Sequence, residues 1–262
     1  MRPRASVKGK LSTADSAKLF LGATVRVGDV GEAASLLRDG FCGEHFDVLV
    51  PCPASRTGTP RDAWAIDHQA HVLALAAAKN AGVTEVVLLS AICVQKSLLA
   101  FQEAKLAFEK TLIESGLTYS IVRATAFFKS LSGQIERVKA GKPFLVFGDG
   151  TLTACKPISD DDLGDYLAGY IDDSLRHNRM LPIGGPGEAI TPREQGERLF
   201  ALLGKPLFFK QVPVALLDTI IAVLGAPWPS AAAAGGKSRP GARWPLLRHR
   251  VNARLGRCGW PV

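Results

Sequence analysis

Phe101 and Lys105 are the residues of this chain whose types and spacing are best suited to chemistry. They are spaced F-x-x-x-K on a predicted helix, just after the apolar run at 85–91. A lysine ammonium carries three N–H donors that can orient a hydroxylated ligand. A tyrosine at position 101 would add an acid able to protonate the alkoxide that carbonyl reduction leaves. Phenylalanine has no such proton, so the pair argues against alcohol or ketone chemistry. The alternative is that Phe101 faces a core and Lys105 is a surface charge.

Further candidate residues follow the predicted strands. In an open parallel sheet, ligands bind outside the carboxyl ends of the strands. The turns at those ends are Gly28–Asp29, Pro53–Ser55, Ser90–Ala91 and Ala124–Ala126. Lys105 lies on the helix after Ser90 and can point back to the same edge. The alternative is that these are ordinary strand-to-helix turns.

The elements that must position these residues alternate between apolar strands and helices. Predicted strands span 22–29, 46–54, 84–91 and 118–124, and predicted helices span 31–41, 61–82 and the segment around Lys105. This order predicts parallel βαβ units with helices on both faces of a sheet. In the helix at 31–41, the 3.6-residue period places Ala34, Leu37 and Phe41 on one face.

Two helices in the second half have clear start signals. Ser159 is a predicted N-cap with Asp162 at the capping-box position, and Thr191 is a predicted N-cap with Glu194 closing its box. The glycine-rich stretch at 184–192 follows a short predicted strand. It favours a tight turn over a phosphate cradle, because it opens a helix capped by Thr191.

The charge of the chain is unevenly distributed. The formal net charge is +8, but residues from 226 onward contain Lys and Arg and no Asp or Glu. The remainder is close to neutral, which argues against a nucleic-acid-binding face. We expect 226–262 to be a disordered basic tail, and a basic interaction tail is the alternative.

Metal and disulfide chemistry is not indicated. The five cysteines are widely spaced without a C-x-x-C motif, and the five histidines have no metal-ligand spacing. We therefore expect no metal site. No apolar run approaches the roughly 18 residues that span a bilayer.

Several stretches together carry a specific resemblance. They are "SRTGTPRDAWAID", "SAICVQK", "TAFFKS", "ACKPIS" and "LPIGGPGEAITPREQGE". Over residues 22–225 the chain resembles the divinyl chlorophyllide a 8-vinyl-reductase family, which are atypical short-chain dehydrogenases near the isoflavone-reductase and NmrA-like group. The resemblance implies an α/β fold with a Rossmann-like doubly wound parallel sheet. It also implies an oxidoreductase that uses NADPH to reduce the C8 vinyl group of a chlorophyll precursor to ethyl.

The resemblance also assigns roles to residues. Lys105 matches the catalytic lysine that hydrogen-bonds the nicotinamide ribose. The remaining matches line the cofactor: Asp29 and Val30 beside the adenine, Ala54, Ser55 and Ser90 along the cofactor, and Thr125, Ala126 and Phe127 over the nicotinamide.

The implied partner is a tetrapyrrole, divinyl chlorophyllide, with no nucleic acid and with peripheral association at a thylakoid or envelope membrane. The implied location is the chloroplast, with a bacterial cytoplasm as the alternative. A different class of function stays open: a non-catalytic NmrA-like nucleotide-binding or regulatory module.

The chain departs from the family pattern in two respects. Ala124 and Ser97 stand where the family usually has proline. More seriously, the family's first strand, glycine-rich G-x-G-x-x-G turn, first helix and second strand have no match here. We therefore expect a basic loop remnant at 1–21, an incomplete NAD(P)-binding Rossmann part at 22–155 and a small substrate-side α/β part at 156–225. Since the pyrophosphate would lose its helix N-terminus, we expect this chain to bind NADPH weakly or not at all.

Overall fold

The protein is described by a computed structural model covering residues 4–6, 20, 22–57, 59–171 and 173–216. It forms two compact units that share the chain discontinuously. Unit 1 contains Met1–Phe128 and Lys156–Gly187, and unit 2 contains Lys129–Cys155 and Glu188–Val262. The predicted tail at 226–262 lies outside the described residues.

Unit 1 is built on a parallel sheet of four strands in the order β3-β4-β5-β7. The strands are β3 (Val48–Leu49), β4 (Glu85–Ala91), β5 (Thr118–Ala124) and β7 (Arg179–Ile183). The predicted strands at 84–91 and 118–124 are confirmed almost to the residue. The strand predicted at 46–54 is much shorter, because Pro51 and Pro53 follow β3 directly and have no N–H to donate to the ladder.

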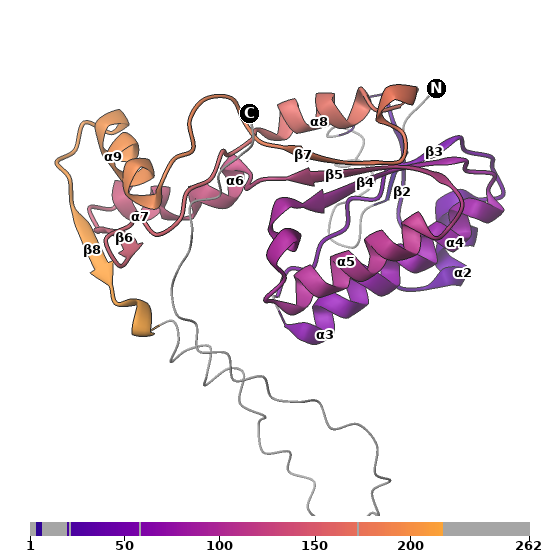
Figure 1. Ribbon diagram of the computed structural model, residues 1–262, viewed down its shortest axis with the longest axis horizontal. Helices are drawn as coiled ribbons and strands as arrows, with labels where there is room; N and C mark the ends of the chain where they lie inside the picture. The colour runs from indigo at the N-terminus through magenta and orange to yellow at the C-terminus, as the bar shows by residue number, and fades with distance from the viewer. Residues whose placement is uncertain (1–3, 7–19, 21, 58, 172, 217–262) are drawn as a thin grey trace, which may run out of the picture. The chain divides into compact units, whose positions relative to one another are not determined.

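Helices cover both faces of this sheet, which confirms the doubly wound fold (Figure 1). One face carries α4 (His71–Asn80) and α5 (Ala100–Ile113), and the other carries α8 (Asp160–Ala168). Two short segments, α3 (Pro60–Ala63) and the π-helical η2 (Trp64–Ala70), run directly into α4. Gly82 ends this long helix at φ +81°, as predicted.

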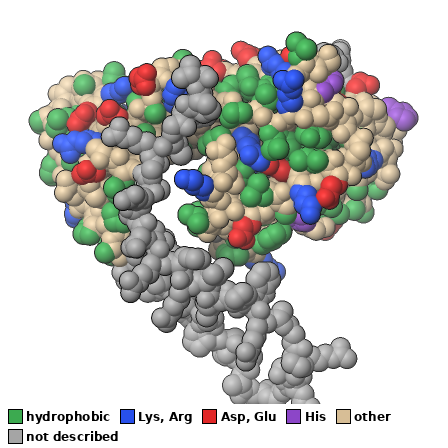
Figure 2. Space-filling view, in the orientation of Figure 1, with side chains coloured by type: hydrophobic (Ala, Val, Ile, Leu, Met, Phe, Trp, Pro, Cys, Tyr) green, Lys and Arg blue, Asp and Glu red, His purple; other side chains and the backbone are tan. Residues whose placement is uncertain are grey.

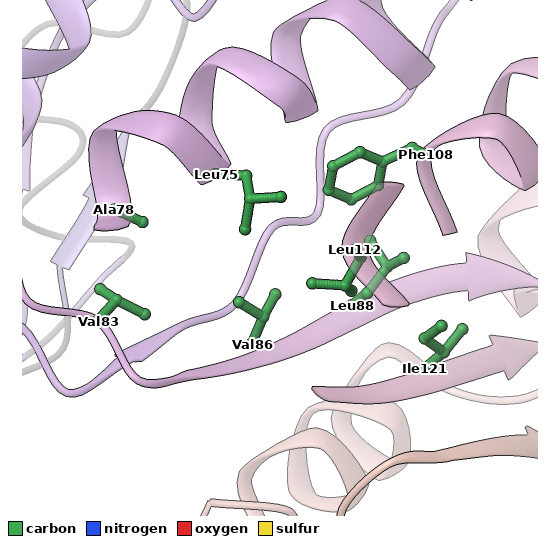
Figure 3. Packing of buried hydrophobic residues seen from close by; sticks show 8 residues of the cluster. All are labelled: Leu75, Ala78, Val83, Val86, Leu88, Phe108, Leu112 and Ile121. Atoms are coloured by element: carbon green, nitrogen blue, oxygen red, sulfur yellow. The ribbon is translucent and has the colours of Figure 1, made fainter. Parts of the chain in front are cut away.

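The core of unit 1 follows the alternation of side chains along β4 and β5. Val86, Leu88 and Ile121 pack with Leu75, Ala78, Val83, Phe108 and Leu112 under α4 and α5 (Figure 3). Val87 and Val122 face the opposite side and pack with Leu163, Leu167 and Tyr170. Each fully buried aliphatic side chain contributes about 1.5–3 kcal/mol, so both faces of the central strands hold the fold together.

A second, two-stranded sheet in unit 1 corrects the expected loop at 1–21. Arg4–Ser6 forms strand β1, which pairs in parallel with β2 (Thr24–Arg26). The segment expected to be a loop therefore contains a strand, and this strand lies beside β2. A neighbouring backbone satisfies the N–H and C=O groups that β2 would otherwise expose at an edge.

The helix predicted at 31–41 also differs from expectation. It consists of α2 (Ala33–Ser35) followed by the π-helical η1 (Leu36–Phe41). Ala34, Leu37 and Phe41, which we placed on one face, do line one hollow together. Leu36 is buried, whereas Leu37 is 42% exposed.

The domain boundary expected at residue 155 also differs. After visiting unit 2, the chain returns to unit 1 at Lys156 and supplies both α8 and β7. The edge of β5 offers a row of free backbone groups, and β7 pairs with them in parallel. The segment at 156–187 therefore belongs to the sheet rather than to a substrate-side part.

Unit 2 contains its own small core. Its elements are η4 (Ser132–Gln134), α7 (Ile135–Lys139), β6 (Phe144–Phe147), α9 (Pro192–Leu202) and β8 (Phe209–Val212), with β6 and β8 parallel. Val138, Phe144, Val146 and Phe200 are buried together. The predicted N-caps are confirmed: Thr191 Oγ1 accepts from Glu194 N, and Ser159 Oγ accepts from Asp162 N in unit 1. The remaining short helices are η3 (Ile92–Lys96), α6 (Phe128–Leu131) and η5 (Ser174–Arg176).

The surface gives little sign of a single charged face. In Figure 2, Lys and Arg side chains alternate with Asp and Glu over the face shown. Within the described residues, no helix is both long enough and apolar enough to cross a membrane. That part of the chain also holds no group of three or more potential metal ligands.

Candidate active site

Lys105 is positioned by the way helix α5 begins. The segment after β4 and η3 turns back into the helix, and the Gln102 side chain holds this turn. Its Oε1 accepts from Leu98 N at 2.7 Å and Leu99 N at 2.9 Å, while its Nε2 donates to Cys93 O at 3.2 Å. These bonds fix the start of α5, and Lys105 follows about one helical turn later. Lys105 lies near the carboxyl end of β4.

The Lys105 ammonium forms an ion pair with a residue that the sequence did not indicate. Lys105 Nζ lies 3.1 Å from Asp67 Oδ1, and the two side chains are 12% and 1% exposed. Ser55 N also donates to Asp67 Oδ1, at 3.4 Å. Lys105 is therefore not a surface charge, and Asp67 connects it to the loop after β3.

The π-helical turn η2 brings Asp67 into the interior. In the next turn, His71 Nδ1 donates to Ile66 O at 2.9 Å, and its ring packs on Phe108 with centroids 4.8 Å apart. Burial lowers the pKa of His71 from 6.5 to about 4, so the ring is neutral near pH 7. Asp67 Oδ2 and His71 Nε2 are both buried, and neither has a hydrogen-bond partner among the described residues.

A second buried ion pair lies one turn further along α5. Glu109 Oε2 accepts from Arg123 Nη2 at 2.5 Å, and Glu109 Oε1 accepts from Ser90 Oγ at 2.5 Å. Ser90, which we predicted to contact a cofactor, is buried and directs its hydroxyl to Glu109 beneath α5. Each carboxylate has a cation beside it, so neither buried pair carries a net charge.

The remaining predicted residues on this edge divide into two groups. Ala54 and Ser55 follow β3, and Ser55 joins Lys105 through Asp67. Asp29 and Val30 follow β2, where Asp29 N donates to Ser35 Oγ at 2.8 Å and Asp29 Oδ1 accepts from Gly31 N at 2.8 Å. Ser55 thus joins the Lys105–Asp67 pair and Ser90 lies beside the same side chains, whereas Asp29 bonds to Ser35 at the end of α2 and to Gly31.

Thr125, Ala126 and Phe127 follow β5 and are held by the returning chain. Thr125 Oγ1 donates to Lys156 O at 2.5 Å, and Thr125 N donates to Ile183 O at 2.9 Å. Ala126 O accepts from Ile158 N at 3.0 Å, and Phe127 pairs with Ile158 in a single β-bridge. The backbone of this segment is therefore fixed, and the Thr125 hydroxyl is already engaged.

The glycine-rich stretch after β7 forms a close backbone contact. A Cβ at Gly185 would lie 1.9 Å from Pro157 O, so only glycine fits there. Gly185 N donates to Lys156 O at 3.1 Å and is not available to an anion. This agrees with the predicted tight turn and not with a phosphate cradle.

Comparisons with known proteins complete the description. A family described as NAD(P)H-binding matches residues 4–174. Proteins named divinyl chlorophyllide a 8-vinyl-reductase, chloroplastic, are 51% identical in Cucumis sativus and 48% identical in Arabidopsis thaliana, each over 230 residues. Each alignment covers 85% of this chain and 55% of the relative, so the chain spans about half the length of these relatives.

Solved structures of low sequence identity share the fold. The NADPH-dependent quinone oxidoreductase QOR2 of Escherichia coli, complexed with NADPH, matches with a TM-score of 0.66 at 21% identity, covering 86% of this chain and 74% of that one. The triphenylmethane reductase of Citrobacter sp., complexed with NADP(H), matches with a TM-score of 0.65 at 15% identity, covering 87% of this chain and 75% of that one.

Proposed function

Because the chain belongs to the NAD(P)H-binding family, we propose that it is part of an NADPH-dependent reductase that converts the C8 vinyl group of divinyl chlorophyllide to ethyl. The observation that carries this proposal is the 51% identity to the Cucumis sativus reductase over 85% of the chain. The reaction adds a hydride and a proton across one carbon–carbon double bond, and the cofactor is oxidised to NADP⁺.

The Lys105 cluster fits the ribose of such a cofactor. An ammonium has three donors, and the Lys105–Asp67 pair occupies one of them. Asp67 Oδ2 is a buried acceptor without a partner among the described residues. Lys105 is 12% exposed, so one of its remaining donors can serve a ribose hydroxyl while the buried Asp67 holds the ammonium from the interior. The sequence contains no G-x-G-x-x-G motif, so the fit extends to the ribose and not to the pyrophosphate.

In this proposal the residues of the chain orient the cofactor and do not supply the hydride. When bound, NADPH supplies the hydride. Lys105 orients the ribose, Asp67 and Ser55 keep Lys105 in place, and the fixed backbone at 125–127 borders the same edge of the sheet. Phe101 donates no proton, so the carbon next to the macrocycle takes its proton from water or another donor, while the conjugated ring delocalises the charge.

The test is a pigment assay. Purified protein is incubated with NADPH and divinyl chlorophyllide, and the products are separated by chromatography. Because we expect weak cofactor binding, NADPH is supplied in millimolar excess, and 8-ethyl pigment and NADP⁺ should then appear slowly and in equal amounts. Lys105→Met should lower kcat/KM about 10- to 100-fold, because a charged hydrogen bond is lost. Lys142→Met, which alters an exposed lysine of unit 2, is the control and should leave kcat/KM unchanged.

Two results would contradict this reading. If 8-ethyl pigment does not appear although NADPH binds, a non-catalytic nucleotide-binding module is the better description. If Lys105→Met turns over pigment like the unaltered protein, Lys105 has no part in the reaction. Calorimetric titration with NADPH also tests the expectation that this chain binds the cofactor weakly, which micromolar affinity would contradict.

The location and a membrane contact belong to the same proposal. The relatives are named chloroplastic, which supports a chloroplast location for this protein. The exposed leucines Leu98 and Leu99, near the start of α5, are compatible with peripheral contact to thylakoid or envelope lipids. Flotation with galactolipid vesicles tests this contact, and recovery of all protein in the unbound fraction would rule it out.

A further inference from the structure

We propose that Asp67 is a positioning residue for the reductase: its carboxylate fixes the Lys105 ammonium so that the remaining lysine donors serve the cofactor ribose. This inference rests on the proposed function. It starts from the 3.1 Å separation of Lys105 Nζ and Asp67 Oδ1 and from the near-complete burial of Asp67, which is 1% exposed.

Asp67 connects three segments at the carboxyl edge of the sheet. Its Oδ1 accepts from Ser55 N, in the loop after β3, and also pairs with Lys105, on α5 after β4. Asp67 itself belongs to η2, whose π-helical turn is the kind of helix irregularity that often occurs at functional sites. The same carboxylate therefore sets the position of the lysine relative to the loop that borders the cofactor edge.

The neighbouring ion pair shows what a purely structural pair looks like in this protein. Both oxygens of Glu109 are occupied: Oε1 accepts from Ser90 Oγ, and Oε2 accepts from Arg123 Nη2. Asp67 differs, because Oδ2 is buried and has no partner among the described residues. Buried carboxylate oxygens are nearly always hydrogen-bonded. The Asp67 carboxylate is therefore held from the interior through Oδ1 alone, by Lys105 and Ser55, which sets it apart from the fully bonded Glu109.

The charge in this cluster also depends on Asp67. His71 lies in the same closely packed group of side chains as Asp67 and Lys105, and it is neutral near pH 7. Glu109 lies one turn after Lys105 on α5, but both of its oxygens are occupied by Arg123 and Ser90. Asp67 is therefore the carboxylate that pairs with the Lys105 ammonium in the described residues, and its removal leaves a buried cation with no anion in contact.

The decisive experiment is a double-mutant cycle on NADPH affinity in the full chain. Asp67→Asn keeps the side-chain size and an acceptor for Ser55 N but removes the charge. We expect Asp67→Asn and Lys105→Met each to weaken NADPH binding about tenfold. The double variant should bind no more weakly than Lys105→Met alone, because Asp67 acts only through Lys105.

A control and a rescue separate positioning from folding. Glu103→Gln removes an exposed carboxylate from the same helix and should leave NADPH affinity unchanged. Asp67→Glu restores the charge and should recover part of the affinity that Asp67→Asn loses, even where both variants lower the melting temperature. Wild-type affinity in Asp67→Asn, or an equal loss from Asp67→Asn with and without Lys105, would overturn the proposal.

A second measurement does not depend on cofactor binding. Reductive methylation of lysines, resolved by mass spectrometry, reports the accessibility of the Lys105 amine. Asp67→Asn should accelerate methylation of Lys105 at least fivefold while Lys142 reacts at its original rate. An unchanged rate at Lys105 would refute the control of Lys105 by Asp67. Failure of the unaltered chain to bind NADPH would count against the proposed function of this chain, and the labelling result would still decide the role of Asp67.

Discussion

At the scale of single residues, the burial of His71 lowers the stability of the fold at acidic pH. It is 2% exposed, and its pKa is lowered from 6.5 to about 4, first by burial. The unfolded chain takes up this proton near pH 6.5, whereas the folded chain resists protonation until about pH 4. The stabilisation that goes with a neutral His71 is complete above pH 6.5 and is lost as the pH falls toward 4.

The size of this effect gives a prediction. Since one pKa unit corresponds to about 1.4 kcal/mol, the free energy of unfolding should fall by about 3 kcal/mol between pH 6.5 and 4. His71→Asn keeps a donor for Ile66 O and should remove that dependence, although lost packing on Phe108 lowers stability at every pH. Urea unfolding at several pH values measures this pH dependence of the free energy of unfolding. His68→Asn, in the preceding turn η2, is the control. An equally steep acid decline in His71→Asn would refute the assignment.

Spacing was enough to find Lys105, and the structure places it at the predicted edge. Asp67 could not be found in this way. In the sequence it stands between Ile66 and His68 in an apparently regular helix, where an acidic residue is normally solvated. Only the π-helical turn η2 directs it inward, and periodicity rules assume the α-helical repeat. Ser90 shows the converse: its position after β4 was predictable, but its bond to Glu109 was not.

At the scale of elements, two helical glycines have opposite roles. In α9, a Cβ at Gly196 would lie 2.4 Å from Phe209 Cε1 and 3.1 Å from Phe144 Cδ1. The Phe209 ring packs edge-on against both Phe144 and Phe200, so it cannot swing away. In α8, by contrast, nothing lies within 4 Å of a Cβ at Gly164.

The two substitutions should therefore change stability in opposite directions. Gly196→Ala should lower the free energy of unfolding by about 1–3 kcal/mol through overpacking. Gly164→Ala should raise it by up to about 1 kcal/mol, because alanine is the better helix former. Denaturant titration combined with hydrogen exchange measures both changes. Faster exchange in β6 and β8 is expected for Gly196→Ala, and a gain in stability from this variant would contradict the packing argument.

Some elements were predictable and others were not, for identifiable reasons. β4 and the middle of β5 are short runs of Val, Leu and Ile buried on both faces, which is a clear strand signal in a sequence. β6 and β8 have four residues each and no distinctive pattern, and we did not predict them. The signals of Ser159 and Thr191 were reliable because N-capping depends on local side-chain chemistry rather than on distant contacts.

At the scale of the whole molecule, chain order does not reveal the order of strands. β7 contains Pro182, which a central strand would not tolerate but an edge strand does. Its partner β5 ends at Ala124, and β7 begins 55 residues later, at Arg179. Sequence therefore identified a strand near 180 but could not show that it completes the sheet of unit 1.

This arrangement predicts the behaviour of a fragment. A chain ending at residue 155, the boundary expected from the sequence, lacks Leu163, Leu167 and Tyr170, which cover Val87 and Val122. We expect it to bind the dye ANS and to melt without a cooperative transition, because one face of its sheet is bare. The full chain should melt cooperatively. A sharp melting transition in the fragment would show that the chain up to residue 155 folds without the returning segment.

The return of the chain at Lys156 also matters on the ribosome. β4 and β5 are synthesised together, but the last residue of β7, Ile183, emerges only after the segment that belongs to unit 2. At about 5–20 residues per second, the nascent sheet waits several seconds for the helix and strand that cover it. Translation speed across codons 129–155 therefore sets how long an apolar sheet face is open to chaperones or to aggregation.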